Sequence, residues 1–221
     1  MRPLSDYAPH ERLPTCLAIY LFTRQYPQLA SSPIANWRPG HEIQINIDST
    51  GLTRTDSGKA FVDADGIVCR VIRIPHRDGT FKNPWIKAGA TKYWDLIGTS
   101  GWDWKEKVSH WVGFDFDSTD GHKNGLSEDQ LDATVDAIKS LPYVTLRTSK
   151  SGNGYHALVP FEKPVKCPTR ADQGRISQYV LDRMSTDAGF DFTKTVDVGG
   201  KILWHWSRNT SNGLQTIQTA V

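Results

Sequence analysis

The stretch Trp111-Val112-Gly113-Phe114-Asp115-Phe116-Asp117-Ser118 holds two carboxylates inside an otherwise apolar run. The run has the composition of a β-strand, in which successive side chains point to opposite faces. Asp115 and Asp117 therefore share one face and lie roughly 6.5 to 7 Å apart along the strand. The opposite face carries apolar side chains, which we expect to lie in a core: Val112, Phe114 and Phe116.

Two readings of this strand are open. Like charges this close repel each other, and hard divalent cations that prefer oxygen ligands supply a counter-charge, which indicates a metal-dependent enzyme. The other reading is a strand with a solvated outer face, in which Asp117 begins a polar turn over residues 118–121. A D-x-D pair by itself does not separate the two readings.

The length and the net charge of the chain limit the number of cores it can form and its general attraction to nucleic acid. The chain has 221 residues, of which 38% are apolar, so it can bury one sizeable core or two small ones. Its formal net charge of +2 gives no general attraction to nucleic acid, so any basic surface must be local.

The cysteines and the hydropathy bear on location. Cys16, Cys69 and Cys167 form no C-x-x-C pair, which argues against a zinc ribbon and against a disulfide scaffold. No stretch reaches the apolar length of a membrane span. We expect a chain in a reducing cytoplasm with no membrane partner.

The N-terminal half shows mixed patterns. Residues 13–25 have a partial apolar stripe that predicts a helix, and the alternation over 42–47 predicts a half-solvated strand. Further strands are expected at 61–62 and 68–74. Residues 75–107 show no clear period, and we expect a long loop layer there with a short helix.

After residue 108 the pattern becomes regular. The expected order is the strand ending at Asp117, a helix over 127–140, strands at 143–149 and 155–161, a helix over 169–189 and a strand at 201–206. This order is the split β-α-β arrangement of ferredoxin-like and RNA-recognition-motif folds. We therefore predict an α+β protein with an N-terminal α/β subdomain at 1–107 and an RNA-recognition-motif-like catalytic subdomain at 108–221.

That topology gathers the polar residues. The first and third strands are neighbours in it, and the fourth flanks the first. Asp115 and Asp117 lie on the first strand, His156 on the third and Asp197 just before the fourth. Three carboxylates so placed would hold two divalent ions about 3.5 to 4 Å apart, as in phosphoryl displacement.

The turn between the middle strands suits an anion. Its glycines, Gly152 among them, let backbone N–H groups form a nest, and the hydroxyls of Ser149 and Ser151 add donors. His156 and Lys201 would add contacts to a triphosphate. The alternatives are an ordinary Asn-Gly hairpin, a core histidine and a solvated lysine.

These motifs together resemble the archaeo-eukaryotic primase superfamily, and more closely the primase-polymerase domains of phages and mobile elements. They are G-F-D-F-D in a strand, S-G-N-G-Y-H in a hairpin and V-D before a last strand with a basic residue, over about residues 102–208. The resemblance implies a template-directed nucleotidyltransferase that uses two Mg²⁺ or Mn²⁺ ions. Its other partners would be single-stranded DNA template, nucleoside triphosphates and a fused or separate helicase, in a bacterial host cell.

By the same resemblance, the metal ligands and catalytic residues would be Asp115, Asp117 and Asp197. The nucleotide contacts would be Ser151, His156 and Lys201. Gly154 stands two residues before His156 where the family has a serine, so that role passes to Ser151 or Ser149.

A second stretch suits single-stranded nucleic acid. Cations and aromatics alternate over residues 81–87 and 92–94, so that bases could stack on rings while ammonium groups meet phosphates. The alternative is a loop whose aromatics cover the edge of a core.

Three classes of function compete. The first is the enzyme described above, and the second is a non-catalytic nucleic-acid-binding module on the same fold. The third, a rolling-circle nicking enzyme, would need a histidine-apolar-histidine metal pair, and the seven histidines offer none. No G-x-x-x-x-G-K-[ST] motif occurs, so the chain shows no sign of a helicase motor.

Overall fold

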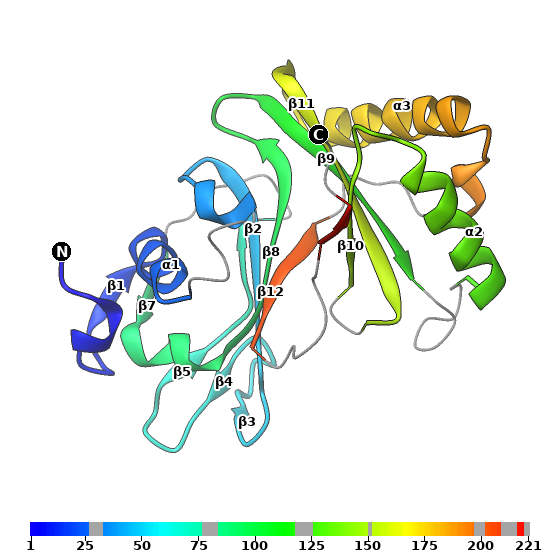
Figure 1. Ribbon diagram of the computed structural model, residues 1–221. Coiled ribbons are helices and arrows are strands. Elements are labelled where there is room, and N and C mark those ends of the chain that lie inside the picture. Colours follow the sequence, from blue (N-terminus) through cyan, green and yellow to red (C-terminus); the bar gives the residue numbers. More distant parts are fainter. Residues whose placement is uncertain are drawn as a thin grey trace. The chain divides into compact units, whose positions relative to one another are not determined.

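The computed structural model describes residues 1–26, 33–76, 84–117, 126–149, 152–196, 202–208 and 216–218. Antiparallel sheets and helices make an α+β protein, as the sequence predicts (Figure 1). The chain divides into two compact units, and each is described by itself. Unit 1 comprises Met1–Pro39, Ile43–Thr99 and His205–Asn209, and unit 2 comprises Gly40–Glu42, Ser100–Trp204 and Thr210–Val221. A domain boundary near residue 107 stays a prediction.

Unit 1 packs one α-helix against short strands. The described elements that begin in or belong to it are η1 (Leu4–Asp6), β1 (Arg12–Pro14), α1 (Thr15–Arg24), η3 (Pro33–Asn36), β2 (His41–Ile47), β3 (Thr53–Arg54), β4 (Phe61–Val62), β5 (Val68–Cys69), β6 (Ile72–Ile74), β7 (Trp85–Lys87), η4 (Ala88–Tyr93) and β8 (Trp94–Asp103). Strand β2 has its first two residues in unit 2, and β8 enters unit 2 at Ser100.

The alternation over β2 explains the core of unit 1. Ile43 and Ile45 are fully buried and face Ile74 and Ile72 across the antiparallel β2–β6 pair, while Gln44 between them is partly exposed. Helix α1 contributes buried side chains to the same cluster, Phe22 among them. The expected half-solvated strand is confirmed.

Two expectations for unit 1 are wrong. The single strand expected at 68–74 is two strands, β5 and β6, separated by Arg70 and Val71. Residues 84–103 were expected within a loop layer with a short helix; the short helix is η4, but the rest forms β7 and the ten-residue strand β8. Nearly every side chain of β8 is buried, so the strand has no solvated face and shows no alternation in sequence.

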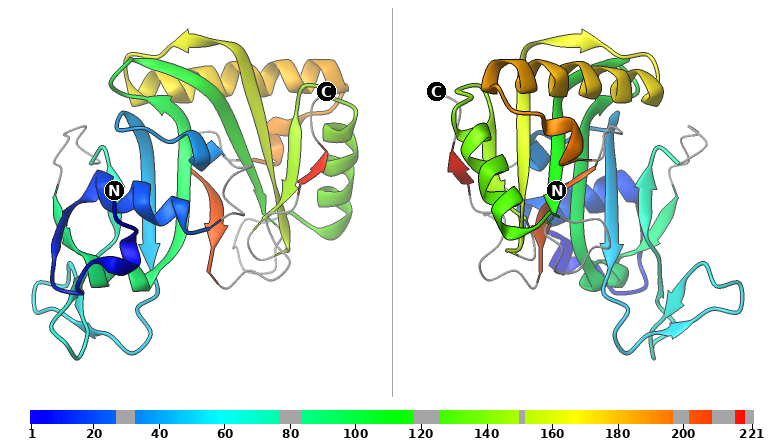
Figure 2. Two further views of the ribbon diagram at one scale, coloured as in Figure 1. Left: turned by 60° about the vertical axis from the view of Figure 1, so that its left-hand side comes forward. Right: turned by 90° about the vertical axis from the view of Figure 1, so that its right-hand side faces the viewer.

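Unit 2 is a sheet covered by helices. Its described elements are β9 (Val108–Asp117), α2 (Glu128–Lys139), β10 (Thr145–Thr148), β11 (Gly154–Lys166), α3 (Arg170–Ala188), η5 (Phe192–Lys194), β12 (Leu203–Ser207) and β13 (Thr216–Gln218), and β12 enters unit 1 at His205. The strand order is β13-β10-β11-β9-β8. Helices α2 and α3 lie on one face of this sheet (Figure 2) and share a hydrophobic cluster with it.

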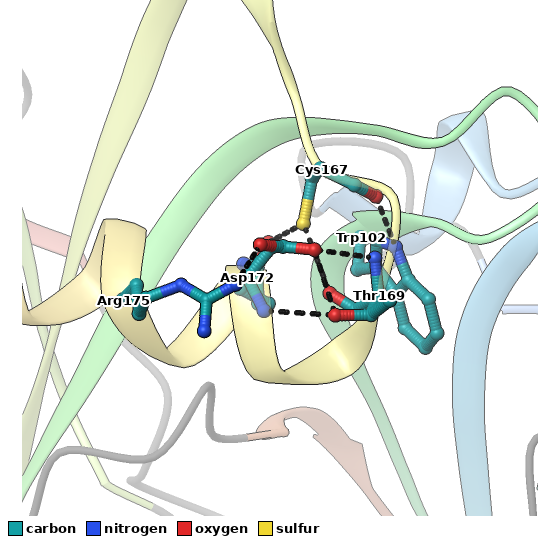
Figure 3. Close-up of polar contacts among 6 residues, drawn as sticks. Trp102, Cys167, Thr169, Asp172 and Arg175 are labelled. Carbon is teal, nitrogen blue, oxygen red and sulfur yellow. Dashed lines mark hydrogen bonds and ion pairs between the residues drawn. The ribbon is translucent and has the colours of Figure 1, made fainter.

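Both long helices begin at residues that the sequence predicts. Ser127 and Thr169 are N-caps, and each forms a capping box with the residue three positions on, Gln130 and Asp172. Figure 3 shows the start of α3, where Asp172 also pairs with Arg175. Gly189 ends the helix in the left-handed conformation at φ 62°. Both helices are confirmed.

The last strand differs from the expectation. The first and third strands of the expected order, β9 and β11, are paired, and β10 lies on the other side of β11. The place beside β9 that was expected for the fourth strand is occupied by β8, and β12 pairs with β8 instead. The cause is local, because β8 and β9 form an antiparallel hairpin with Trp102 opposite Ser109.

Among the described residues, no helix combines the length and the apolar character that crossing a bilayer requires.

Candidate functional site

Strand β9 separates a core face from a polar face. Val112, Phe114 and Phe116 are buried at 1%, 1% and 0% exposure in the cluster with α2 and α3. Asp115 and Asp117 alternate with them and remain partly exposed, the side chain of Asp115 at 22%. The predicted alternation is confirmed, and both carboxylates lie on the face that the helices leave uncovered.

A row of three side chains crosses the sheet at Asp115. His156 on β11 is directly opposite Asp115, and its Nε2 lies 3.2 Å from Asp115 Oδ1. Arg147 on β10 is directly opposite His156, and one terminal guanidinium nitrogen lies 3.5 Å from His156 Nδ1. The imidazole therefore connects a carboxylate on one side with a guanidinium on the other.

Two side chains of this row are buried, and burial strengthens the electrostatic interactions among its members. His156 is 2% exposed and Arg147 is 6% exposed. Burial lowers the pKa of Arg147 to about 10, while the nearby charge of Asp115 raises it. Arg147 remains a cation at neutral pH, and its terminal nitrogen donates a 2.8 Å hydrogen bond to the carbonyl of Trp204. The guanidinium is thus held in place beside the carboxylate and the imidazole.

Asp117 lies opposite a glycine on β11. Its partner across the strands is Gly154, and a Cβ on Gly154 would lie 2.6 Å from the carbonyl oxygen of Phe116. A glycine is therefore needed at this position for the two strands to pair. The S-G-N-G-Y-H motif thus has a structural role in addition to any chemical one.

The turn before Gly154 is closed by backbone hydrogen bonds. Ser149 donates its N–H to the carbonyl of Gly154 at 2.8 Å, and Gly152 donates its N–H to the carbonyl of Ser149 at 3.2 Å. Gly152 has φ 80°, which the turn requires of a glycine. The side chain of Ser149 is buried, and the phosphate roles of Ser149, Gly152 and His156 stay predictions.

Three predicted site residues, Asp197, Ser151 and Lys201, lie outside the described residues. Their roles as third metal ligand, phosphate contact and triphosphate ligand stay predictions. The sequence pattern does not single out Arg147, because a solvated arginine on a strand explains its position equally well. In the predicted hairpin, Arg147 and His156 fall on the same face of adjacent strands. This cross-strand position is the pattern that would have identified Arg147.

The donor set of β9 fits a hard divalent cation. Carboxylate oxygens are the ligands that Mg²⁺ and Mn²⁺ prefer, and Asp115 and Asp117 present theirs on one partly exposed face. The imidazole of His156 lies against Asp115 and so can orient that carboxylate. The described part of the chain supplies two of the three expected carboxylates.

The aromatic and basic stretch at residues 84–87 lies in unit 1. Trp85 on β7 is 60% exposed, which is unusual for so large an apolar side chain. It borders a groove of about 340 Å³, lined by Arg12, Val68, Arg70, Ile72, Trp85, Ile86 and Lys87. The groove therefore combines three cations with an exposed ring, but only Lys87 and Trp85 come from the predicted stretch. Residues 81–83 of that stretch lie outside the described residues, and Trp94 of its second part is buried at 1% exposure, as the alternative of a core edge expects.

Comparisons with solved structures include two distant likenesses. The first is to the primase-polymerase AEP domain of cyanophage S-2L, with 16% identity, 83% of each chain covered and a TM-score of 0.35. The second is to the polymerase domain of Mycobacterium tuberculosis Ligase D in complex with DNA, with 14% identity, 91% of this chain and 72% of that one covered, and a TM-score of 0.38. No protein-family model matches the chain, and no curated protein matches it.

Proposed function

We propose that this chain is a template-directed DNA primase-polymerase that uses two divalent metal ions to synthesise or extend primers, in the replication of a phage or mobile element. The proposal includes an RNA-recognition-motif-like catalytic subdomain. Its support is the sequence resemblance together with the neighbouring strands β9, β11 and β10, which match three of the four strands of such a fold, while β8 takes the place of the fourth.

The observation that carries the proposal is the pair Asp115 and Asp117 beside the buried His156. The carboxylate pair lies beside a buried imidazole and a buried guanidinium. Burial of a charged group costs free energy, so this arrangement calls for a functional explanation. Metal-assisted phosphoryl transfer supplies that explanation, since the carboxylates must be fixed before the ions arrive.

Each residue has a distinct task in this mechanism. Asp115 and Asp117 would hold the ions, which when bound stabilise the attacking 3′-hydroxyl oxygen and the leaving pyrophosphate oxygen. His156 would fix the orientation of Asp115 through their 3.2 Å contact. Arg147 would hold the other side of the imidazole and supply positive charge near the site.

The alternative is a binding module without catalysis, in which the uncovered sheet face stacks bases. The carboxylates of β9 oppose this alternative, because without cations they repel nucleic-acid phosphates. The exposed Trp85 favours nucleic-acid binding under both functions and so does not separate them.

Metal-dependent nucleotide binding separates the two functions. Isothermal titration of a nucleoside triphosphate is compared with Mg²⁺ or Mn²⁺ and with a chelator. The proposal predicts binding that strengthens with the metal, and by linkage the nucleotide should strengthen metal binding by the same factor. Equal affinity in both conditions would remove the metal-bridged mechanism and leave the binding module.

A further inference from the structure

Three side chains of unit 2 that the proposed function does not use lie close together. They are His41 at the start of β2, Asp103 at the end of β8 and His110 on β9, and one ligand atom of each lies within 4.8 Å of the others. His41 Nε2 lies 3.2 Å from Asp103 Oδ2, and the two imidazole centroids are 5.4 Å apart. Three separate elements thus bring two imidazoles and a carboxylate to one point.

The carboxylate of this trio is fixed by the backbone. Asp103 is 5% exposed, and its Oδ1 accepts hydrogen bonds from the N–H groups of Lys105 and Glu106, each at 2.9 Å. Those bonds orient Oδ2 toward His41. This is how metal-binding carboxylates are commonly held, with one oxygen anchored and the other available.

The segment that carries His41 is also held against Asp103. Gly40 accepts a 2.9 Å hydrogen bond at its carbonyl from the N–H of Trp104. A Cβ on Gly40 would lie 2.9 Å from Asp103 Oδ1, and the φ of 151° at this residue also favours glycine. The glycine therefore permits the close approach of residue 41 to the carboxylate.

The distances suit a small transition-metal ion. Tetrahedral Zn²⁺ has ligand bonds of about 2.0 to 2.2 Å, which place its ligand atoms about 3.4 Å from one another. His41 and Asp103 already have that separation at 3.2 Å, and the remaining distances, at most 4.8 Å, would shorten on binding. Imidazole nitrogens favour Zn²⁺ and its neighbours over Mg²⁺.

An ion pair between His41 and Asp103 is the simpler explanation of these contacts. It accounts for the 3.2 Å distance but not for the nearby imidazole of His110. Two positively charged imidazolium rings would repel each other at this separation. A bound cation needs both rings neutral and explains all three positions together.

We propose that His41, Asp103 and His110 form a binding site for Zn²⁺ or a chemically similar divalent transition metal, separate from the site on Asp115 and Asp117. The ion would join the start of β2 to the β8–β9 hairpin. The proposal shares no ligand with the primase-polymerase hypothesis, so either can fail while the other stands.

The test uses the 221-residue chain free of any affinity tag, in an Asp115→Asn, Asp117→Asn background that removes the other carboxylate pair. Co²⁺ and Zn²⁺ are the probes, and the readouts are Co²⁺ absorbance, Zn²⁺ titration and thermal unfolding with zinc or chelator. His110→Ala removes one ligand, and His10→Ala is the matched control because that histidine is exposed and outside the trio.

The expected result is tetrahedral Co²⁺ absorbance, displaced by a stoichiometric amount of Zn²⁺, and a higher Tm with zinc than with chelator. His110→Ala should weaken Zn²⁺ binding by at least about 100-fold, since changes to outer partners alone cost up to that factor. His10→Ala should bind as the parent does. Equal binding in parent and His110→Ala, or a parent Tm that zinc does not raise, would overturn the proposal; the Tm readout needs no ligand variant to fold.

Discussion

At the scale of single residues, the row Asp115–His156–Arg147 is the feature on which the proposed function depends. The three side chains come from three neighbouring strands. His156 is directly opposite Asp115 on one side and directly opposite Arg147 on the other. Register fixes which side chains meet, so a shift of one residue in any strand would move one member of the row to the core face.

We predict that Asp115 and His156 are energetically coupled. A double-mutant cycle with Asp115→Ala and His156→Ala, measured by urea unfolding, should give a coupling free energy of about 0.5 to 3 kcal/mol, the range for residues in contact. Additive effects would mean that the 3.2 Å contact contributes nothing to stability.

A second prediction concerns Asp63 in unit 1. Its carboxylate accepts hydrogen bonds from the N–H of Ile67 at 2.8 Å and the hydroxyl of Tyr93 at 2.8 Å, and it pairs with Lys92 at 3.1 Å. Burial opposes the charged form, but these partners outweigh it and lower the pKa of Asp63 to about 2.

Because this pKa is lowered on folding, Asp63 stabilises the protein above its unfolded pKa of about 3.9, and the stabilisation is lost as the pH falls toward 2. In urea unfolding at several pH values, the native protein should exceed Asp63→Asn in stability at pH 6, and the difference should shrink below about pH 4. A difference that stays constant to pH 2 would contradict the assignment.

At the scale of elements, the β8–β9 hairpin was the feature that the sequence pattern predicted least well. Its strand β8 is buried on both faces, so the period-2 pattern that identified β2 and β9 is absent. The capped helices α2 and α3 were predictable because Ser127 and Thr169 mark their starts by local chemistry.

The close pairing of β8 and β9 predicts that a side chain at Gly101 destabilises the protein. A Cβ there would lie 1.8 Å from the carbonyl oxygen of Trp111, which is backbone and cannot move aside. Gly101→Ala should destabilise the protein by at least about 3 kcal/mol in urea unfolding, at the upper end of overpacking effects. The matched control is Gly174→Ala in α3, where the added Cβ has no contact within 4 Å, and a gain of up to about 1 kcal/mol is expected.

The groove beside β7 gives a prediction about nucleic acid. Trp85→Ala should weaken single-stranded DNA binding by about 1 to 3 kcal/mol if a base stacks on the ring, measured by fluorescence anisotropy. Tyr179→Ala is the control, because Tyr179 is an aromatic residue on α3 with 73% exposure and no place in the groove. The same loss in both variants would argue against a specific stacking site.

At the scale of the whole molecule, the sequence predicted the α+β class, the two faces of β9 and both long helices. It did not predict that β12 pairs with β8, because strand pairing far apart in sequence leaves no local pattern. Nor did it predict the row through Arg147, or the trio of His41, Asp103 and His110, because those residues are brought together only by the register of the folded sheet.

The central claim is that the carboxylates of β9 support nucleotide incorporation. The measurement is extension of a labelled primer on a single-stranded DNA template with nucleoside triphosphates and Mg²⁺ or Mn²⁺. It compares the native protein with Asp115→Ala and with Asp136→Ala, a control whose side chain on α2 is 76% exposed. The account predicts metal-dependent extension by the native protein and by Asp136→Ala, and none by Asp115→Ala. Undiminished extension by a folded Asp115→Ala variant would contradict it.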